Sequence, residues 1–326
     1  MIPGMSGRIY LAATWVSLLA ALLFTARGAK AWGCEGHQTV ALIAKKHLNP
    51  RALAMVEKIL RENPIDPTLK RFCPSEGLDP MADAATWADD YRERDPNTAG
   101  WHFFDIPRGA SQNGIDQFCS SGGCVVSALA EQVAILRTPG VDPKKRADAL
   151  RYVIHFVGDI HQPLHCSTNN DRGGNCVPVD YFGKHTKLTD AQAGAYSPNL
   201  HSVWDVDIVE TIAKGETAEE FAAELDGQFH PRMAAWRRLG VNFDDWAWES
   251  HQEAEHTTYG RLPQKIKVES PVEVSTCRDD GDVSARMLAL HEDLEQPYED
   301  ASEPVVREQL AKAGVRLAMI LNQIWK

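Results

Sequence analysis

The stretch from Arg151 to Asn175 (RYVIHFVGDIHQPLHCSTNNDRGGN) constrains this chain more than any other. His155 and Asp159 are four residues apart, so on a helix an imidazole and a carboxylate lie on one face, one turn from each other. Both side chains can then bind one metal ion. The helix must end at Gln162-Pro163, because a proline forces the residue before it out of the α region. His165 therefore lies just beyond the helix, where it can bind a second ion.

A single histidine and aspartate at this spacing is weak evidence, because a buried helical histidine is more often satisfied by hydrogen bonds. The spacing recurs at His201 and Asp205 in the segment NLHSVWD, and His102 lies among aromatic residues in WHFFD. Imidazole and carboxylate ligands without thiolate suit zinc. The repetition therefore predicts a zinc site, whereas His161 is interpreted as a core residue and not as a ligand.

The N-terminal residues 1–31 have the pattern of a secretory signal peptide. Arg8 precedes an apolar run from Ile9 to Phe24, and Ala29-Lys30-Ala31 is a small-x-small cleavage signal. A membrane anchor is less favoured, because the run is shorter than the ~20 residues that a span needs. We expect a secreted or periplasmic protein without stable membrane insertion. Cleavage near Ala31 would free the amine of Trp32, which can chelate a metal together with the carbonyl oxygen of the same residue.

The net charge of the mature chain argues against a protein that binds duplex DNA through a basic surface. Residues 1–31 carry three basic residues and no acid, so cleavage changes the net charge from −11 to −14. Duplex DNA is held largely by Lys and Arg that neutralise its phosphates. If the substrate is a phosphate ester, bound metal ions must therefore supply the attraction locally.

The chain contains seven cysteines, all after residue 31. In an exported chain without a C-x-x-C pair they are expected to form disulfides. Cys119 and Cys124 are predicted to close a small loop, and Cys166 with Cys176 is a candidate for another. One cysteine remains without a partner that the sequence can identify.

Hydrophobic periodicity and helix-end signals predict a mainly α protein. Helices are expected at 37–48, 50–63, 81–93, 125–138, from 143 through Asp159, 200–214, from 217 onward, 231–239, 244–257 and 305–325. The alternating segment Val177 to Leu188 predicts one small β-hairpin. Since no linker or repeat interrupts the pattern, residues 32–326 are expected to form a single domain that acts as a monomer.

Taken together, the His155/Asp159/His165 spacing, the GGN at 173–175 and the NLHxxWD at 199–205 make the chain resemble the zinc-dependent S1/P1 nuclease family. The resemblance extends from the WGxxGH that ends at His37 to the AGVRLA around Arg316. It implies the helical single-domain fold that this family shares with bacterial zinc phospholipases C. It also implies three Zn²⁺ ions per chain.

The resemblance implies a ligand set for each ion. The first zinc would be bound by Asp89, His102, His155 and Asp159. The second would be bound by the amino nitrogen and carbonyl oxygen of Trp32, by His37, and by Asp159 as a bridge. The third would be bound by His165, His201 and Asp205.

The resemblance also implies hydrolysis of single-stranded DNA and RNA to 5′-phosphorylated products, with 3′-nucleotides as a further possible substrate. Asp89 and Arg92 would take part in catalysis, with Arg92 binding the phosphoryl oxygens. Phe103 and Asp105 match positions that stack on and hydrogen-bond to a base, although Phe103 has a core role as an open alternative. Asn175 either contacts the phosphate or shapes the GGN turn. The insertion at 188–198 lies beside the expected cleft.

Two other functions remain as alternatives. A zinc phospholipase C is disfavoured by Arg92, by the pair Phe103 and Asp105, and by an aspartate at position 205. A secreted zinc-binding protein without catalysis is disfavoured because structural zinc sites usually have four protein ligands. The third ligand set has three residues, which leaves a position for water or substrate.

Overall fold

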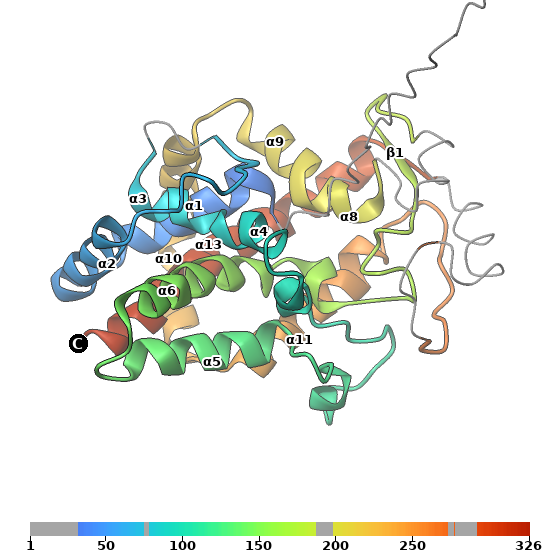
Figure 1. Cartoon of the computed structure of the whole chain (residues 1–326). Helices are drawn as coiled ribbons and strands as arrows, with labels where there is room; N and C mark the ends of the chain where they lie inside the picture. Colours follow the sequence, from blue (N-terminus) through green and yellow to red (C-terminus); the bar gives the residue numbers. More distant parts are fainter. Residues whose placement is uncertain (1–31, 75–77, 187–197, 273–276, 278–291) are drawn as a thin grey trace, which may run out of the picture.

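The longest helix, α13 (Gln296–Ile324), lies along the middle of the molecule in the computed structural model (Figure 1), which describes residues 32–74, 78–186, 198–272, 277 and 292–326. It packs against α1 (Gly33–Lys46), α6 (Pro143–Asp159) and α10 (Ala218–Arg238). Helix α5 (Val125–Arg137) covers the other side of α6. The prediction of a mainly α fold is confirmed.

The remaining helical elements are short and surround these helices. They are α2 (Pro50–Glu62), α3 (Pro80–Ala85), α4 (Trp87–Arg92), η1 (Pro96–His102), η2 (Ile115–Phe118), η3 (Pro163–Cys166), α8 (Leu200–Ser202), η4 (Val203–Asp207), α9 (Ile208–Ala213), α11 (Phe243–Glu253) and η5 (Ala254–Thr258). Elements η4 and η5 are π-helical turns, and the other η elements are 3-10 helices. Single π-helical turns are common at functional sites.

Helix α6 begins at a capped position and is buried along its C-terminal half. Asp142 accepts a hydrogen bond from the backbone N–H of Lys145, and Pro143 occupies the first helical position. Every residue from Ala149 to Asp159 is buried, so the helix is enclosed along its C-terminal half. Side chains near Asp159 are therefore held in a rigid and largely water-free environment.

Several helix boundaries differ from the prediction. The last helix begins at Gln296 and not at Val305, and the expected helix at 200–214 is divided into α8, η4 and α9. The expected helix at 81–93 is divided at Thr86 into α3 and α4. The expected separate helix from Pro231 is instead part of α10, which continues through this proline. Phe229 and Met233 are buried on either side of Pro231, so tertiary packing outweighs the local cost of the proline.

The predicted β-hairpin is wrong in its strand partner. Strand β1 (Val179–Tyr181) pairs in parallel with β2 (Glu292–Leu294), and Val179 lies opposite Glu292. A tight turn does follow β1, because Tyr181 and Lys184 exchange two backbone hydrogen bonds. Alternating hydrophobicity detects the strand but carries no information about a partner more than 100 residues away. Residues 187 and 188 of the expected hairpin lie outside the described residues.

The disulfides are partly as expected. Cys119 and Cys124 are bonded, which confirms that prediction. The pairing of Cys166 with Cys176 is wrong, since Cys176 is bonded to Cys277. Cys166 is a buried free thiol whose sulfur faces the carbonyl oxygen of Ile160 at 3.6 Å. Its short sequence separation from Cys176 was misleading, because the partner of Cys176 is 101 residues away in the sequence.

A third disulfide joins Cys34 at the start of α1 to Cys73. It fastens the N-terminal end of α1 to the loop before α3. The expected signal peptide lies outside the described residues. Within the part of the chain that the structure describes, no helix is both long enough and apolar enough to span a membrane.

Candidate metal centre

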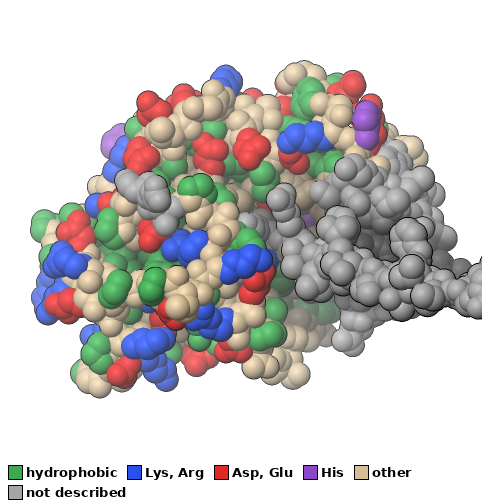
Figure 2. All heavy atoms as spheres, turned by 45° about the horizontal axis from the view of Figure 1, so that its top comes forward, with side chains coloured by type: hydrophobic (Ala, Val, Ile, Leu, Met, Phe, Trp, Pro, Cys, Tyr) green, Lys and Arg blue, Asp and Glu red, His purple; other side chains and the backbone are tan. Residues whose placement is uncertain are grey.

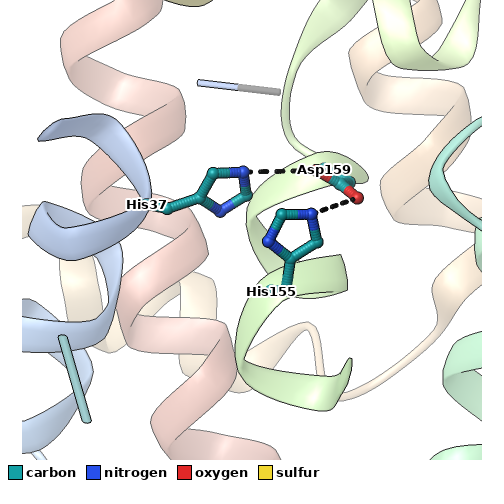
Figure 3. A group of neighbouring side chains, drawn as sticks. All are labelled: His37, His155 and Asp159. Carbon is teal, nitrogen blue, oxygen red and sulfur yellow. Dashed lines mark ion pairs between the residues drawn. The ribbon is translucent and has the colours of Figure 1, made fainter. Parts of the chain in front are cut away.

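The centre begins at the C-terminal end of α6. His37 from α1 and His155 from α6 both point toward the carboxylate of Asp159 (Figure 3). Nε2 of His37 lies 3.4 Å from Oδ1 of Asp159, and Nε2 of His155 lies 3.2 Å from Oδ2. All three side chains are fully buried, and their ligand atoms form a first group that could hold a metal ion.

A second group adjoins the first and shares His155 with it. Asp89 from α4 and His102 from η1 complete this group. Nδ1 of His102 lies 3.0 Å from Oδ2 of Asp159 and 3.8 Å from Oδ1 of Asp89. Asp159 thus lies between the two groups, where one carboxylate can serve both.

The third group consists of His165 from η3, His201 from α8 and Asp205 from η4. Nε2 of His201 lies 3.2 Å from Oδ2 of Asp205, and Nε2 of His165 lies 3.8 Å from Oδ1. His165 also lies 3.8 Å from Asp159, so the third group is next to the first two.

Backbone carbonyls fix the orientation of three of these imidazoles. Nδ1 of His155 lies 2.7 Å from the carbonyl oxygen of Ala85, and Nδ1 of His165 lies 2.9 Å from that of His102. Nδ1 of His201 makes the same contact with Gly173 at 2.6 Å. A carbonyl oxygen only accepts, so each Nδ1 carries a hydrogen, and Nε2 is the nitrogen that faces the centre.

Several candidate ligand atoms are buried without partners. Among the described residues, buried side-chain atoms without a hydrogen-bond partner include Nε2 of His37, Oδ1 of Asp89, Oδ1 of Asp159, Nε2 of His165, Nε2 of His201 and Oδ2 of Asp205. Leaving so many buried polar atoms unpaired is costly, and native proteins rarely do so. Metal ions bound between these atoms would satisfy them, so the residues present fit a multinuclear metal site.

The electrostatics of the centre favour ligand forms without protons. Burial would raise the pKa of Asp159, but the charge of His155 and the close contacts with the imidazoles of His102, His155 and His37 hold this pKa well below its usual range. Burial lowers the pKa of His165 to about 4 and also lowers the pKa values of His37 and His102. These imidazoles are therefore neutral and ready to bind a metal.

The pKa values of His201 and His155 are raised instead. Burial opposes the charged form of His201, but the nearby carboxylate of Asp205 raises its pKa. The shift is large for His155. Burial opposes its charged form, but the carboxylates of Asp159 and Asp89 raise its pKa to about 9. The same two carboxylates would favour a metal cation at this point, and that cation would displace the proton.

The N-terminal residue of the described chain reaches the centre through its indole. Trp32 is fully buried, and its Nε1 donates to the carbonyl oxygen of Gly158 at 2.8 Å, one residue before Asp159. A Cβ on Gly158 would lie 2.7 Å from Nδ1 of His37, so only glycine allows this close approach. Trp32 and His37 are thus held against α6 beside Asp159.

The other predicted site residues surround the three groups. Nη1 of Arg92 lies 3.4 Å from Oδ1 of Asp89. The half-buried ring of Phe103 lies 4.9 Å from that of His165 and 6.4 Å from that of His201. Asp105 is exposed and lies within electrostatic reach of His201. Each of these three residues therefore lies near at least one member of the three groups.

Asn175 and His161 have structural contacts. Nδ2 of Asn175 donates to the carbonyl oxygen of Arg172 at 2.8 Å, which favours its role in the GGN turn. His161 is buried between the carbonyl oxygen of Val157 and the guanidinium of Arg316, as expected for a core residue.

Four further histidines, His185, His251, His256 and His291, have no motif around them, so the sequence alone predicts surface residues. For His251 this prediction is wrong: it is 1 % exposed, and its Nδ1 lies 3.2 Å from the carbonyl oxygen of Cys166. Nothing in its local sequence indicates that α11 packs against η3. His185 and His256 are exposed, and His291 lies outside the described residues.

Sequence reasoning missed the residues that position the ligands. Gln162 contacts Asp205, and Asp171 accepts hydrogen bonds from the backbone N–H of Gly174 and the hydroxyl of Tyr259 in the turn that holds His201. In the sequence, Gln162-Pro163 predicts only the end of a helix. The position of the polar Gln162 between the candidate ligands Asp159 and His165 was the signal that could have identified it.

The fold and these three groups define a mainly helical protein with a buried histidine/aspartate centre that could hold metal ions. A family model described as S1/P1 Nuclease matches residues 32–326, and the chain belongs to that family. It is accordingly a hydrolase that acts on phosphodiester bonds of nucleic acids.

Three relatives illustrate this membership. Nuclease S1 of Aspergillus oryzae is 30 % identical over 325 residues, which cover 94 % of this chain and 96 % of that protein. Nuclease P1 of Penicillium citrinum is 28 % identical over 90 % of this chain and 97 % of its own. Endonuclease 2 of Arabidopsis thaliana is 26 % identical over 93 % and 94 %.

Proposed function

We propose that the mature chain is an exported trinuclear zinc nuclease that hydrolyses single-stranded DNA and RNA to 5′-phosphorylated products. Dephosphorylation of 3′-nucleotides is a second activity to assay. The observation that carries the proposal is the set of three adjoining groups, each with buried ligand atoms that have no hydrogen-bond partner among the described residues. Export, with cleavage near Ala31, is part of the proposal because it would free the amine of Trp32.

The donor set favours zinc. Imidazole nitrogens and carboxylate oxygens without thiolate are typical zinc ligands, and the third group has three residues, as catalytic zinc sites do. We assign one ion to Asp89, His102, His155 and Asp159, one to Trp32, His37 and Asp159, and one to His165, His201 and Asp205. Bound zinc supplies Lewis-acid polarisation of phosphoryl oxygens and lowers the pKa of water toward ~7.

Residues of the chain complete the site. The guanidinium of Arg92, held against Asp89, is placed to bind phosphoryl oxygens as negative charge develops on them. The ring of Phe103 lies beside the third group and is only half-buried, so a base can stack on its free face. Stacking requires a base outside a duplex, which accounts for the proposed preference for single strands. The carboxylate of Asp105 can accept a hydrogen bond from that base.

The charge distribution on the surface suggests that the substrate is attracted mainly by the metal centre itself. On the face shown in Figure 2, acidic and basic side chains are interspersed among the described residues. The whole chain has a net charge of −11. Long-range attraction of a polyanion is therefore weak, and the metal centre with Arg92 must provide most of the binding.

A metal count combined with substrate assays tests the proposal. The mature chain beginning at Trp32 should contain three zinc ions by inductively coupled plasma mass spectrometry and should cleave single-stranded DNA and RNA. A zinc phospholipase C would instead turn over a lecithin emulsion, and a non-catalytic zinc protein would turn over neither. Absence of transition metal, or lipid turnover without nucleic-acid turnover, would refute the proposal.

Arg92→Ala should lower kcat/KM on single-stranded DNA by about 10²–10³-fold, the usual cost of losing one preorganised charge-stabilising group. Arg92→Lys should recover only part of this loss, because an ammonium cannot bind two phosphoryl oxygens in the bidentate geometry of a guanidinium. Both variants should retain three zinc ions, since Arg92 forms an ion pair with Asp89 and is not itself a ligand. Parental kinetics in Arg92→Ala would show that Arg92 only neutralises Asp89.

A further inference from the structure

Every residue of the third group is oriented by a hydrogen bond to a residue outside the group. His165 and His201 are held through Nδ1 by the carbonyl oxygens of His102 and Gly173. Asp205 is held instead by a side chain, the carboxamide of Gln162. Gln162 is therefore the one of these three anchors that a substitution can remove without moving the backbone.

The carboxamide of Gln162 can adopt only one orientation. Its Oε1 accepts the backbone N–H of Leu164 at 2.5 Å, where Gln162 caps the short helix η3. Its Nε2 is consequently directed at Asp205 and donates to Oδ1 at 2.5 Å. Flipping the amide would place its oxygen against the carboxylate of Asp205, and the side chain is fully buried, so water cannot compensate.

This contact distinguishes the two oxygens of Asp205. Oδ1 accepts the hydrogen bond from Gln162, whereas Oδ2 is buried without a hydrogen-bond partner among the described residues. Oδ2 is also the oxygen that lies 3.2 Å from Nε2 of His201. The hydrogen bond thus occupies one oxygen and leaves the other facing the third group.

The backbone of Gln162 links the groups. Its N–H donates to the carbonyl oxygen of Asp159 at 3.0 Å, and its own carbonyl accepts from the N–H of His165 at 3.0 Å. One buried residue therefore connects the end of α6 to His165 through its backbone and to Asp205 through its side chain.

We propose that Gln162 is a positioning residue that directs a single oxygen of Asp205 to the metal ion of the third group and so sets the affinity for that ion. The inference rests on the proposed function, because it requires an ion at the third group. Hydrogen-bond partners of metal ligands typically contribute 10–100-fold to metal affinity. The effect should be confined to the third ion, since the other two groups do not include Asp205.

Two variants and a matched control test this inference in the mature chain. Gln162→Met keeps the length of the side chain and removes both hydrogen bonds. Gln162→Glu keeps the acceptor for the N–H of Leu164 and replaces the donor that faces Asp205 by an oxygen. Gln132→Met is the control, because Gln132 is a buried glutamine on α5 without a hydrogen bond to any residue of the three groups.

Each protein is loaded with zinc, equilibrated with graded chelator and analysed for bound zinc, and its circular dichroism is recorded. We expect both Gln162 variants to release one ion at a free zinc concentration about 10–100-fold higher than the parent does. The other two ions should be released as in the parent. The control should match the parent throughout.

The outcomes separate the inference from the proposed function. If the parent binds three ions and both folded Gln162 variants release all three as the parent does, the positioning role is refuted alone. Equal weakening of all three ions would also refute it, because that result indicates general loosening of the fold. If Gln162→Met does not fold, Gln162→Glu decides. A parent that never binds a third ion overturns the inference and the proposed function together.

Discussion

Asp159→Asn should abolish detectable hydrolysis of single-stranded DNA and remove more than one metal ion from the chain. The carboxylate of Asp159 lies within 3.4 Å of nitrogens from His37, His102 and His155, so it is the point where the first two groups meet. A neutral amide cannot bridge two cations. Because losing one charge-stabilising group already costs 10²–10³-fold, we expect a fall in kcat of about 10³-fold or more.

The measurement pairs zinc content with turnover, and Asp207→Asn serves as its control. Asp207 lies two residues after Asp205 on the same π-helical turn, but its carboxylate pairs with Lys184 and belongs to none of the three groups. The control should keep three ions and parental turnover. If the Asp159→Asn chain also kept three ions and parental turnover, the carboxylate of Asp159 would not bridge two metal ions.

The residues of the centre that the sequence could predict are those fixed by local geometry. His155 and Asp159 share a helix face whatever the rest of the chain does, and His201 and Asp205 repeat the spacing. The structure places both pairs in groups that could hold metal, although η4 is π-helical and not the regular helix expected. The spacing succeeded because a turn with one more residue still leaves both side chains on one side.

Features that depend on contacts between distant segments could not be predicted in the same way. The partner of β1, the pairing of Cys176 with Cys277 and the burial of His251 each involve segments far apart in the sequence. Hydrophobic pattern and spacing report on one segment at a time. They show that a strand or a cysteine needs a partner but do not identify it.

The groups that orient the candidate ligands could not be predicted from the sequence for another reason. His155, His165 and His201 are oriented by backbone carbonyls, and every residue has one. No residue type marks the carbonyls of Ala85, His102 or Gly173 as special. Only the fold shows which of them face an imidazole, so the orientation of these rings is a tertiary property.

Addition of one residue ahead of Trp32 should remove one metal ion and reduce turnover by about 10²–10³-fold, the cost typical of losing one electrostatic group in a catalytic site. The side chain of Trp32 is fully buried and its indole donates to Gly158 beside Asp159, so the residue is fixed at the centre. An added residue converts its free amine into an amide, which has no lone pair to offer a metal. The added residue must also find space next to Trp32, which is fully buried.

The experiment compares three chains: one that begins at Trp32, one with a single methionine before it, and one with methionine added after Lys326. Lys326 is exposed at the far end of the chain, so the C-terminal addition has the same composition but does not reach the centre. Mass spectrometry verifies each terminus, and zinc content and hydrolysis of single-stranded DNA are then measured. We expect loss only with the N-terminal addition. If that chain retains three ions and parental turnover, the amine of Trp32 is not a ligand, and His37 and Asp159 must complete their group without it.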